Sequence, residues 1–347
     1  MNIHDYVVSS RESIYQAQIP LSIPILIPIH PSPSPSPVFV LVPGASQSPA
    51  HYGLLMHLLL TRGHPVYSAI LPSTGPGNAK NVTAQVDAEY VREHMLLPIL
   101  DTEGHDVVLV MHSYSGIPGS AATYGLGKKD REVAGKKTSV LGQIYIASLL
   151  VKGGDGGNIV DALGGSLPPH IMPDVGWRVG GESSHFHNYL AVDERIIVAL
   201  GGALLPSNST LKTLPPPLHL HLSANTPPQE PSGVLTCADT GPPPYSDVTP
   251  STFQNAIVTS TLCPSYASWH SPCPRASWDQ ESFKGKIAFI RTLNDTGVPL
   301  QFQDMFMQNT GEEWIVRDMD TGHSPQLVQP ERVCDALIEL ARGFGGV

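Results

Sequence analysis

A serine follows an apolar run in the first third of the sequence. Residues 107–111 are all apolar, His112 and Ser113 come next, and the small residues Ser115 and Gly116 follow. A continuous apolar run is typical of a buried parallel strand. A serine at the carboxyl end of such a strand, followed by small residues that open a helix, is held clear of the sheet. We therefore interpret Ser113 as a nucleophile.

The spacing agrees only in part with the G-x-S-x-G pattern of a strained nucleophile turn. Met111 and Ser115 occupy the positions of the two glycines. Those glycines allow the strand, the turn and the helix to approach closely, and serine is nearly small enough to replace one, whereas methionine is not. From these residues alone, an ordinary strand-to-helix turn with a surface serine is the alternative interpretation.

A histidine near the carboxyl end can serve as the base that Ser113 would need. His323 follows Gly322 in a turn after a predicted strand at 314–317. A neutral imidazole that bonds the serine hydroxyl accepts its proton during attack and returns it to the leaving group. The sequence holds 15 histidines, and most histidines have structural or surface roles. With Ser113 as the nucleophile, the position of His323 favours the role of general base.

An aspartate after the preceding predicted strand can orient that histidine. Asp295 follows residues 286–291 and lies in a segment whose composition also favours a simple turn. The order serine, aspartate, histidine along the chain is the one expected for this kind of triad, and it favours Asp295. The rival acid is Asp155, which follows a predicted strand at 144–147 but stands among glycines.

Attack on a carbonyl creates an oxyanion that needs hydrogen-bond donors held in place beforehand. The expected donors are the main-chain N–H groups of Tyr114, directly after the nucleophile, and of Ala45, in the loop after the first predicted strand. In that loop we expect Pro43 to stiffen the turn and Gly44 to adopt a φ angle that other residues resist. Taken alone, the loop is equally consistent with a plain turn.

Predicted strands and helices alternate along the chain, which indicates an α/β fold with a parallel sheet. Ligands of such sheets bind at the carboxyl ends of the strands. The predicted strands cover 38–42, 66–70, 107–112, 144–147, 286–291 and 314–317, and the predicted helices about 51–62, 81–97, 116–124 and 330–342.

Four regions differ in composition. Residues 1–37 end in a Pro/Ser repeat that favours extended conformation, and we predict an amino-terminal tether. The core is predicted over 38–151 and 281–347, and 152–280 is predicted to be a lid or cap excursion over the strand ends. Within the excursion, 193–241 lacks periodicity; it is either a disordered insertion or sequence translated from an unremoved intron.

Charge and cysteine content restrict the partners. The net charge is −10, and Lys and Arg form no cluster, so neither nucleic acid nor an anionic membrane surface is expected as a partner. The apolar stretch at 19–29 is interrupted by three prolines, which argues against a signal core or membrane helix. The four cysteines form no CxxC pair, so we expect no metal site; no cofactor is expected either. We expect a cytoplasmic protein with free thiols, a Cys263–Cys273 disulfide being the alternative.

The chain resembles the α/β-hydrolase superfamily, and within it the branch of plant methyl-ester esterases and hydroxynitrile lyases, with similar fungal and bacterial hydrolases. The resemblance rests on residues 42–45, 112–116, 294–303 and 322–325 and covers about 38–192 and 242–345. It implies a mostly parallel sheet with helices on both faces and a lid inserted after the sixth strand. It also implies Ser113, Asp295 and His323 as the triad.

This sequence departs from the family pattern at several points. Pro43 stands where many members have histidine, Ser115 replaces a glycine, the insertion is long, and no amino-terminal hairpin is evident. Only the main chain is needed at Pro43, so that change leaves the mechanism intact. Because of the long insertion, the family pattern does not predict the form of the lid or of the substrate pocket.

Three functions are compatible with these residues. The first is a serine hydrolase that cleaves a small-molecule carboxylic ester, thioester or lactone through an acyl-enzyme. The second is a lyase or cyclase on the same scaffold, and the third is an inactive ligand-binding member. Apolar and aromatic residues in the excursion suggest an apolar or aromatic substrate, although such residues more often serve only to pack a lid: Trp177, Phe186, Tyr189, Tyr266 and Trp269.

Overall fold

The computed structural model describes residues 36–74, 79–168, 171–173, 178–179, 182–183, 235–237 and 245–345. The predicted tether at 1–37 lies outside these residues except for its last two. The insertion predicted at 193–241 lies outside them except for 235–237.

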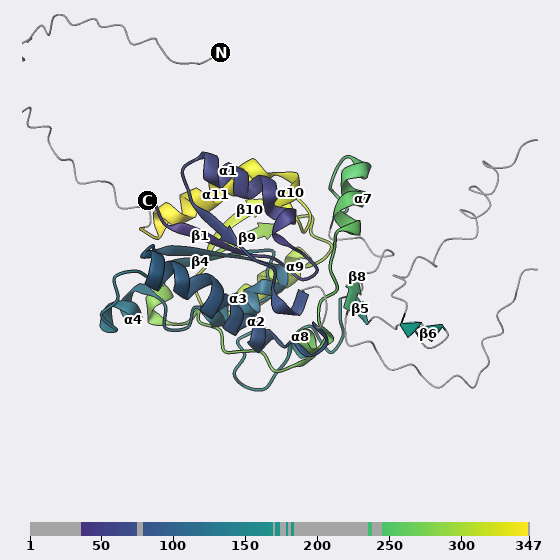
Figure 1. Cartoon of the computed structure of the whole chain (residues 1–347), viewed down its shortest axis with the longest axis horizontal. Coiled ribbons are helices and arrows are strands. Elements are labelled where there is room, and N and C mark those ends of the chain that lie inside the picture. The colour runs from purple at the N-terminus through teal and green to yellow at the C-terminus, as the bar shows by residue number, and fades with distance from the viewer. Residues whose placement is uncertain are drawn as a thin grey trace, which may run out of the picture. The chain divides into compact units, whose positions relative to one another are not determined.

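Six strands form the central sheet in the order β10-β9-β4-β3-β1-β2, and every pairing is parallel (Figure 1). The chain passes from β1 to β2 on one side and then returns to place β3 on the other side of β1. Sheets of this kind bind ligands at such a reversal, beyond the carboxyl ends of the strands. The bounds are β1 (Val38–Val42), β2 (Val66–Ser68), β3 (Val107–His112), β4 (Val140–Ile146), β9 (Ile287–Thr292) and β10 (Ile315–Met319).

Helices cover both faces of the sheet, as predicted. Figure 1 shows α1 and α11 together on one face and α2 and α3 on the other. The helical segments that flank the strands are η1 (Pro49–Tyr52), α1 (Gly53–Thr61), η2 (Pro72–Thr74), η3 (Ala79–Asn81), α2 (Ala84–Tyr90), η4 (Val91–Leu96), η5 (Pro98–Glu103), η6 (Ser113–Ser115), α3 (Gly116–Ala122), α4 (Lys128–Val133), η7 (Glu281–Phe283), α9 (Leu300–Thr310), α10 (Pro325–Val328) and α11 (Pro330–Gly343).

Alternate residues of the central strands supply two separate cores. In β3, Leu109 and Met111 pack with α2 and α3, whereas Val108 and Val110 pack with α1 and α11. All six residues of β3 are buried. A strand buried on both faces reads as an unbroken apolar run, which is why its position could be predicted from the sequence.

Several helical regions differ from the prediction, among them α4 and α10, which were not predicted. The helix predicted at 81–97 begins at Ala84, where the Thr83 side chain accepts the Val86 N–H, and it continues through η4 and η5 to Glu103. Gly104 then ends it with a left-handed φ of 75°. The helix α9 was not predicted; its apolar residues are interspersed with polar ones, and only Gln303, Phe306 and Met307 are buried.

The excursion leaves the sheet after β4 and returns at β9. It was predicted to follow a sixth strand, but β4 is the fourth strand of the described sheet in chain order. Its described elements are α5 (Ile159–Ala162), β5 (Ile171–Pro173), β6 (Arg178–Val179), β7 (Glu182–Ser183), β8 (Leu235–Cys237), α7 (Ser251–Thr259) and α8 (Tyr266–His270). Strands β5 and β8 pair antiparallel, as do β6 and β7.

Candidate active site

Ser113 lies at a sharp turn between β3 and α3. Its φ angle is 57°, a left-handed conformation that few residues other than glycine adopt. Strain of this kind at a strand-to-helix turn holds a serine hydroxyl above the carboxyl edge of the sheet. The local backbone therefore has the form that the sequence predicted.

The turn tolerates Met111 because the facing helix has no side chain at the contact. A Cβ atom added at Gly119 in α3 would lie 2.6 Å from the Met111 Sδ. Ser115 is buried, and its hydroxyl accepts the His112 N–H at 2.8 Å and donates to the Val42 carbonyl at 2.8 Å. Gly119 thus provides the space that a glycine at position 111 provides in the usual pattern. Ser115 links the main chain of β3 at His112 to that of β1 at Val42.

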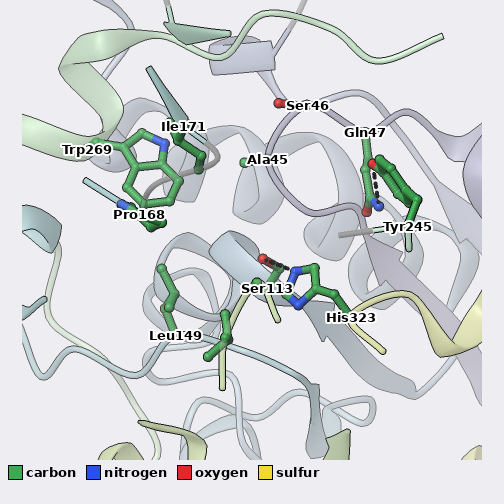
Figure 2. A pocket seen from close by; sticks show the side chains of 12 residues that line it. Ala45, Ser46, Gln47, Ser113, Leu149, Pro168, Ile171, Tyr245, Trp269 and His323 are labelled. Carbon is green, nitrogen blue, oxygen red and sulfur yellow. Dashed lines mark hydrogen bonds between the residues drawn. The ribbon is translucent and has the colours of Figure 1, made fainter. Parts of the chain in front are cut away.

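His323 reaches Ser113 from the loop after β10. Its Nε2 lies 2.9 Å from the Ser113 Oγ, and its Nδ1 lies 2.8 Å from the Asp295 Oδ2 (Figure 2 shows the first pair). Because a carboxylate only accepts hydrogen bonds, Nδ1 carries the hydrogen and Nε2 is left to accept the serine proton. The side chains of His323 and Asp295 are almost fully buried.

Asp295 forms the expected turn and faces the histidine at the same time. Its Oδ1 accepts the N–H groups of Gly297 and Val298 at 2.7 and 2.8 Å, while its Oδ2 accepts the Thr292 hydroxyl at 2.7 Å. Burial by itself raises the pKa of the Asp295 carboxyl, but His323 and these hydrogen bonds together hold the pKa below its usual value. Asp295 is therefore a carboxylate at neutral pH.

The rival acid, Asp155, has a different partner. Its Oδ1 accepts the Gly157 N–H at 3.0 Å within the glycine-rich loop. The described hydrogen bonds of the His323 ring go to Ser113 and Asp295. The structure therefore brings together Ser113, His323 and Asp295 and does not bring Asp155 to them.

The loop after β1 lies beside the nucleophile. Val42 pairs with Met111, so the loop that follows β1 begins next to the turn at Ser113. The reason predicted for Gly44 is wrong, because its φ is not left-handed; Ser46 has that conformation instead, at 64°. Gly44 is required by space: an added Cβ would lie 3.0 Å from the His112 Nδ1 and 3.2 Å from the Ser113 Cβ.

A buried polar group beneath this loop was not predicted. The Tyr52 hydroxyl accepts the Gly44 N–H at 3.1 Å and lies 2.7 Å from the His112 Nδ1. Burial lowers the pKa of His112 to about 3, so its ring is neutral. In the sequence, Tyr52 belongs to an apolar helical pattern that gives no sign of this polar role. The only signal for the buried polar group is the position of His112 next to Ser113.

A pocket opens in front of Ser113 and His323. The loops after β1, β3, β4, β9 and β10 form one part of its wall. The excursion supplies Pro168, Ile171, Tyr245 and Trp269 (Figure 2). Of the aromatic residues named from the sequence, Trp269 lines the pocket, Tyr266 stacks on His270, and Trp177, Phe186 and Tyr189 lie outside the described residues.

The described residues contain no cluster of metal-ligating side chains, no membrane-spanning helix and no Cys263–Cys273 bridge. No group of three or more His, Cys, Asp or Glu side chains in that part of the chain could hold a metal ion. None of its helices has the length and apolar character needed to span a bilayer. Cys273 and Cys334 are free thiols, so the alternative Cys263–Cys273 disulfide is not formed.

Comparison with known proteins identifies relatives of this chain. It is 31% identical over 136 residues to the alpha/beta hydrolase nvfD of Aspergillus novofumigatus (strain IBT 16806). That match covers 39% of this chain and 50% of the relative, so it spans about half the length of the curated protein.

Solved structures resemble the fold at low sequence identity. A variant of polyneuridine aldehyde esterase is 16% identical with a TM-score of 0.53, and the match covers 88% of this chain and 99% of that one. The methylesterase MES16 from Arabidopsis is 16% identical with a TM-score of 0.50 and the same coverages. These structures confirm the predicted fold, which is similar to that of polyneuridine aldehyde esterase and of MES16.

A family model matches most of the sequence, from residue 39 to residue 336. The matched range includes all of β1 except Val38, the Ser113 turn, the excursion and the loop that carries His323. The chain belongs to the alpha/beta hydrolase family.

Proposed function

We propose that this protein hydrolyses a carboxylic ester, thioester or lactone of a small, mainly apolar or aromatic molecule. The observation that carries the proposal is the continuous hydrogen-bonded series from Ser113 through His323 to Asp295, with contacts of 2.9 and 2.8 Å. It begins at a strained turn inside a pocket. Esterases among the similar structures and membership of a hydrolase family support the same reaction class.

The reaction proceeds in two stages on this arrangement. His323 Nε2 accepts the Ser113 proton while the serine oxygen attacks the substrate carbonyl, and the imidazolium then protonates the leaving alcohol, or thiol in a thioester. Water enters next, gives its proton to His323, and releases the acid from the acyl-enzyme. Asp295 keeps the imidazole in the required tautomer and stabilises its positive charge.

Two main-chain groups are proposed to bind the oxyanion. The N–H of Tyr114 follows the nucleophile, and Ala45 lines the pocket from the loop after β1. Tyr52 holds the neighbouring Gly44 N–H at 3.1 Å, which fixes the course of this loop. Donors that are rigid before the reaction need no reorganisation as charge develops on the substrate.

The excursion is proposed to act as the lid. Pro168, Ile171 and Trp269 bring apolar surface to the pocket from this part of the chain. A lid of this kind excludes water and favours substrates with apolar groups. We also propose a cytoplasmic location, with which the free thiols of Cys273 and Cys334 agree.

The lyase and cyclase alternatives are less well supported. In the related hydroxynitrile lyases a lysine beside the catalytic histidine helps to hold cyanide. Here Ser324, Pro325 and Gln326 follow His323. An inactive ligand-binding member would not require the described contacts of Ser113 with His323 and of His323 with Asp295.

A fluorophosphonate probe with intact-mass detection tests the proposal. We expect one adduct on the wild type, none on Ser113→Ala, and one on the control Ser251→Ala, because Ser251 is an exposed residue of α7. Ester turnover in water labelled with oxygen-18 should place the label in the released acid. Adducts that persist in Ser113→Ala, or no adduct on the folded wild type, would contradict the hydrolase proposal.

A further inference from the structure

The pocket contains a buried donor that the triad does not use. The indole Nε1 of Trp269 is buried and has no hydrogen-bond partner among the residues that the structure describes. Trp269 is 3% exposed, and its ring lines the pocket together with Ser113 and Ile171. Figure 2 shows the nitrogen-bearing edge of the ring on the side of Ile171. A buried N–H without an acceptor is costly, and such groups usually have a functional explanation.

Other polar groups of the pocket wall are already engaged. Gln47 donates through its Nε2 to the Tyr245 hydroxyl at 3.2 Å. Ser113 is bonded to His323 at 2.9 Å. Trp269 therefore differs from these groups, because its donor is held in the pocket wall with its hydrogen-bonding capacity unused.

The ring is fixed in position relative to the nucleophile. Trp269 stacks on Tyr114, the residue after Ser113, with ring centroids 5.9 Å apart and an interplanar angle of 22°. The Tyr114 hydroxyl donates to the Asp87 Oδ2 at 2.8 Å, and the Asp87 Oδ1 accepts the Ser73 N–H at 2.9 Å. The indole N–H is thus presented from a rigid support, which is the requirement for a specific polar contact.

We propose that Trp269 is a specificity-determining residue whose indole N–H binds a neutral acceptor oxygen on the substrate, in addition to the reacting carbonyl. This inference rests on the proposed ester hydrolysis and defines its substrate class as oxo-, alkoxy- or amide-bearing esters. The acceptor is neutral because no lysine or arginine is among the described residues of the pocket wall. A site that hydrogen-bonds a substrate group rejects analogues that lack it, since its own polar atom is then left buried without a partner.

The first test compares methyl hexanoate with its 3-oxo, 4-oxo and 5-oxo derivatives. For the wild type, we expect kcat/KM to be about tenfold higher for the best oxo ester than for methyl hexanoate, with the difference mainly in KM. Trp269→Phe keeps an aromatic ring against Tyr114 but removes the N–H together with part of the indole, so this preference should fall below about threefold. Monomethyl glutarate, which carries a carboxylate, should show no such preference.

The matched control is Trp314→Phe. Trp314 also loses an indole N–H on substitution, but its Nε1 donates to the Thr310 Oγ1 at 2.9 Å, and Trp314 is not among the described residues of the pocket wall. The oxo preference should survive in this variant. A wild-type preference below about threefold for all three oxo esters, or a preference that persists in Trp269→Phe, would overturn the inference.

Calorimetric binding to Ser113→Ala separates this inference from the proposed function, because that variant cannot form an acyl-enzyme. We expect the best oxo ester to bind about tenfold more tightly than methyl hexanoate, and the difference to disappear in Ser113→Ala/Trp269→Phe. If this affinity difference is found but the wild-type Ser113 does not react with the fluorophosphonate probe, the hydrolase proposal is refuted and acceptor recognition stands. Equal affinities for the two esters, with normal turnover in the wild type, would refute acceptor recognition alone.

Discussion

The His112 ring is joined to the His323 main chain: its Nε2 donates to the His323 carbonyl oxygen at 2.8 Å. The contact links the last residue of β3 to the loop after β10, across 211 positions of sequence. On its other side, the Nδ1 of the ring lies 2.7 Å from the Tyr52 hydroxyl. His112 therefore ties the loop of the base to the turn of the nucleophile and, through Tyr52, to the loop after β1.

Substitution of His112 should loosen this connection without removing any reacting group. We expect His112→Ala to lower kcat by about tenfold to a hundredfold, because small misplacements of a base have effects of this size. His112→Gln restores a donor near the Nε2 position and should retain more activity. Since the pKa of His112 is about 3, the ratio of variant to wild-type kcat should be constant from about pH 5 to pH 9. A ratio that titrates in this range, or equal losses in both variants, would contradict a positioning role.

Asp295→Asn should decide between the two candidate acids. An amide at this position favours the wrong histidine tautomer, and we expect kcat to fall by about 10³–10⁴-fold. Asp155→Asn should be close to the wild type, since Asp155 bonds only within its own loop among the described contacts. Steady-state kinetics on one ester is sufficient, and near-normal activity of Asp295→Asn would remove Asp295 from the triad.

Gly44→Ala tests the crowding beside the nucleophile. The added methyl would lie 3.0 Å from both the Gln47 Oε1 and the His112 Nδ1, so the loop after β1 must shift. We expect about a tenfold or greater loss of kcat with a smaller effect on the melting temperature. Gly53→Ala is the control, because nothing lies within 4 Å of the added atom. Equal kcat values for the two variants would refute the prediction.

The Met111–Gly119 contact should show strong energetic coupling. Gly119→Ala brings a methyl to 2.6 Å from the Met111 Sδ, and we expect it to cost about 1–3 kcal/mol of unfolding free energy. In Met111→Ala the same methyl has room, so the double variant should be at least about 1 kcal/mol more stable than the sum of the single effects. Urea titration measures all four proteins. Met111→Ala combined with Gly53→Ala should be additive.

Asp87 should make stability depend on pH. Burial raises the pKa of its carboxyl from 3.8 to about 6. Because the raised pKa makes the folded state bind more protons than the unfolded state between these values, stability falls as pH rises through this window. Relative to Asp87→Asn, the wild type should lose about 2 kcal/mol between about pH 4.5 and pH 7.5. Urea titrations at the two pH values measure this change, and parallel pH profiles would contradict it.

The sequence predicted the parts of the molecule that depend on local pattern. The buried runs of β1, β3 and β9 are apolar on both faces, so their positions followed from composition alone. Ser113, Asp295 and His323 each follow a strand, and the parallel arrangement predicts that such residues meet at one edge of a sheet. The His323 ring lies within hydrogen-bond distance of both Ser113 and Asp295.

Features that depend on tertiary contacts could not be predicted in this way. The motif predicts that Met111 is too large for its position, but Gly119, eight residues further on, makes room for it. Gly44 was assigned a conformational role, whereas its neighbours His112 and Ser113 impose a steric one. Whether the indole N–H of Trp269 has a hydrogen-bond partner likewise depends on its surroundings. The sequence alone does not distinguish Trp269 from any other buried tryptophan.

The three side chains of the site come from loops after β3, β9 and β10, and the Ser113–His323 contact spans 210 positions of the chain. β9 joins β3 only through β4, so the site forms when the carboxyl-terminal strands have added to the sheet. Closing loops of this length is slow compared with local helix formation. Recovery of probe labelling during refolding should therefore lag behind the recovery of helical circular dichroism, and catalytic competence would report completion of the sheet.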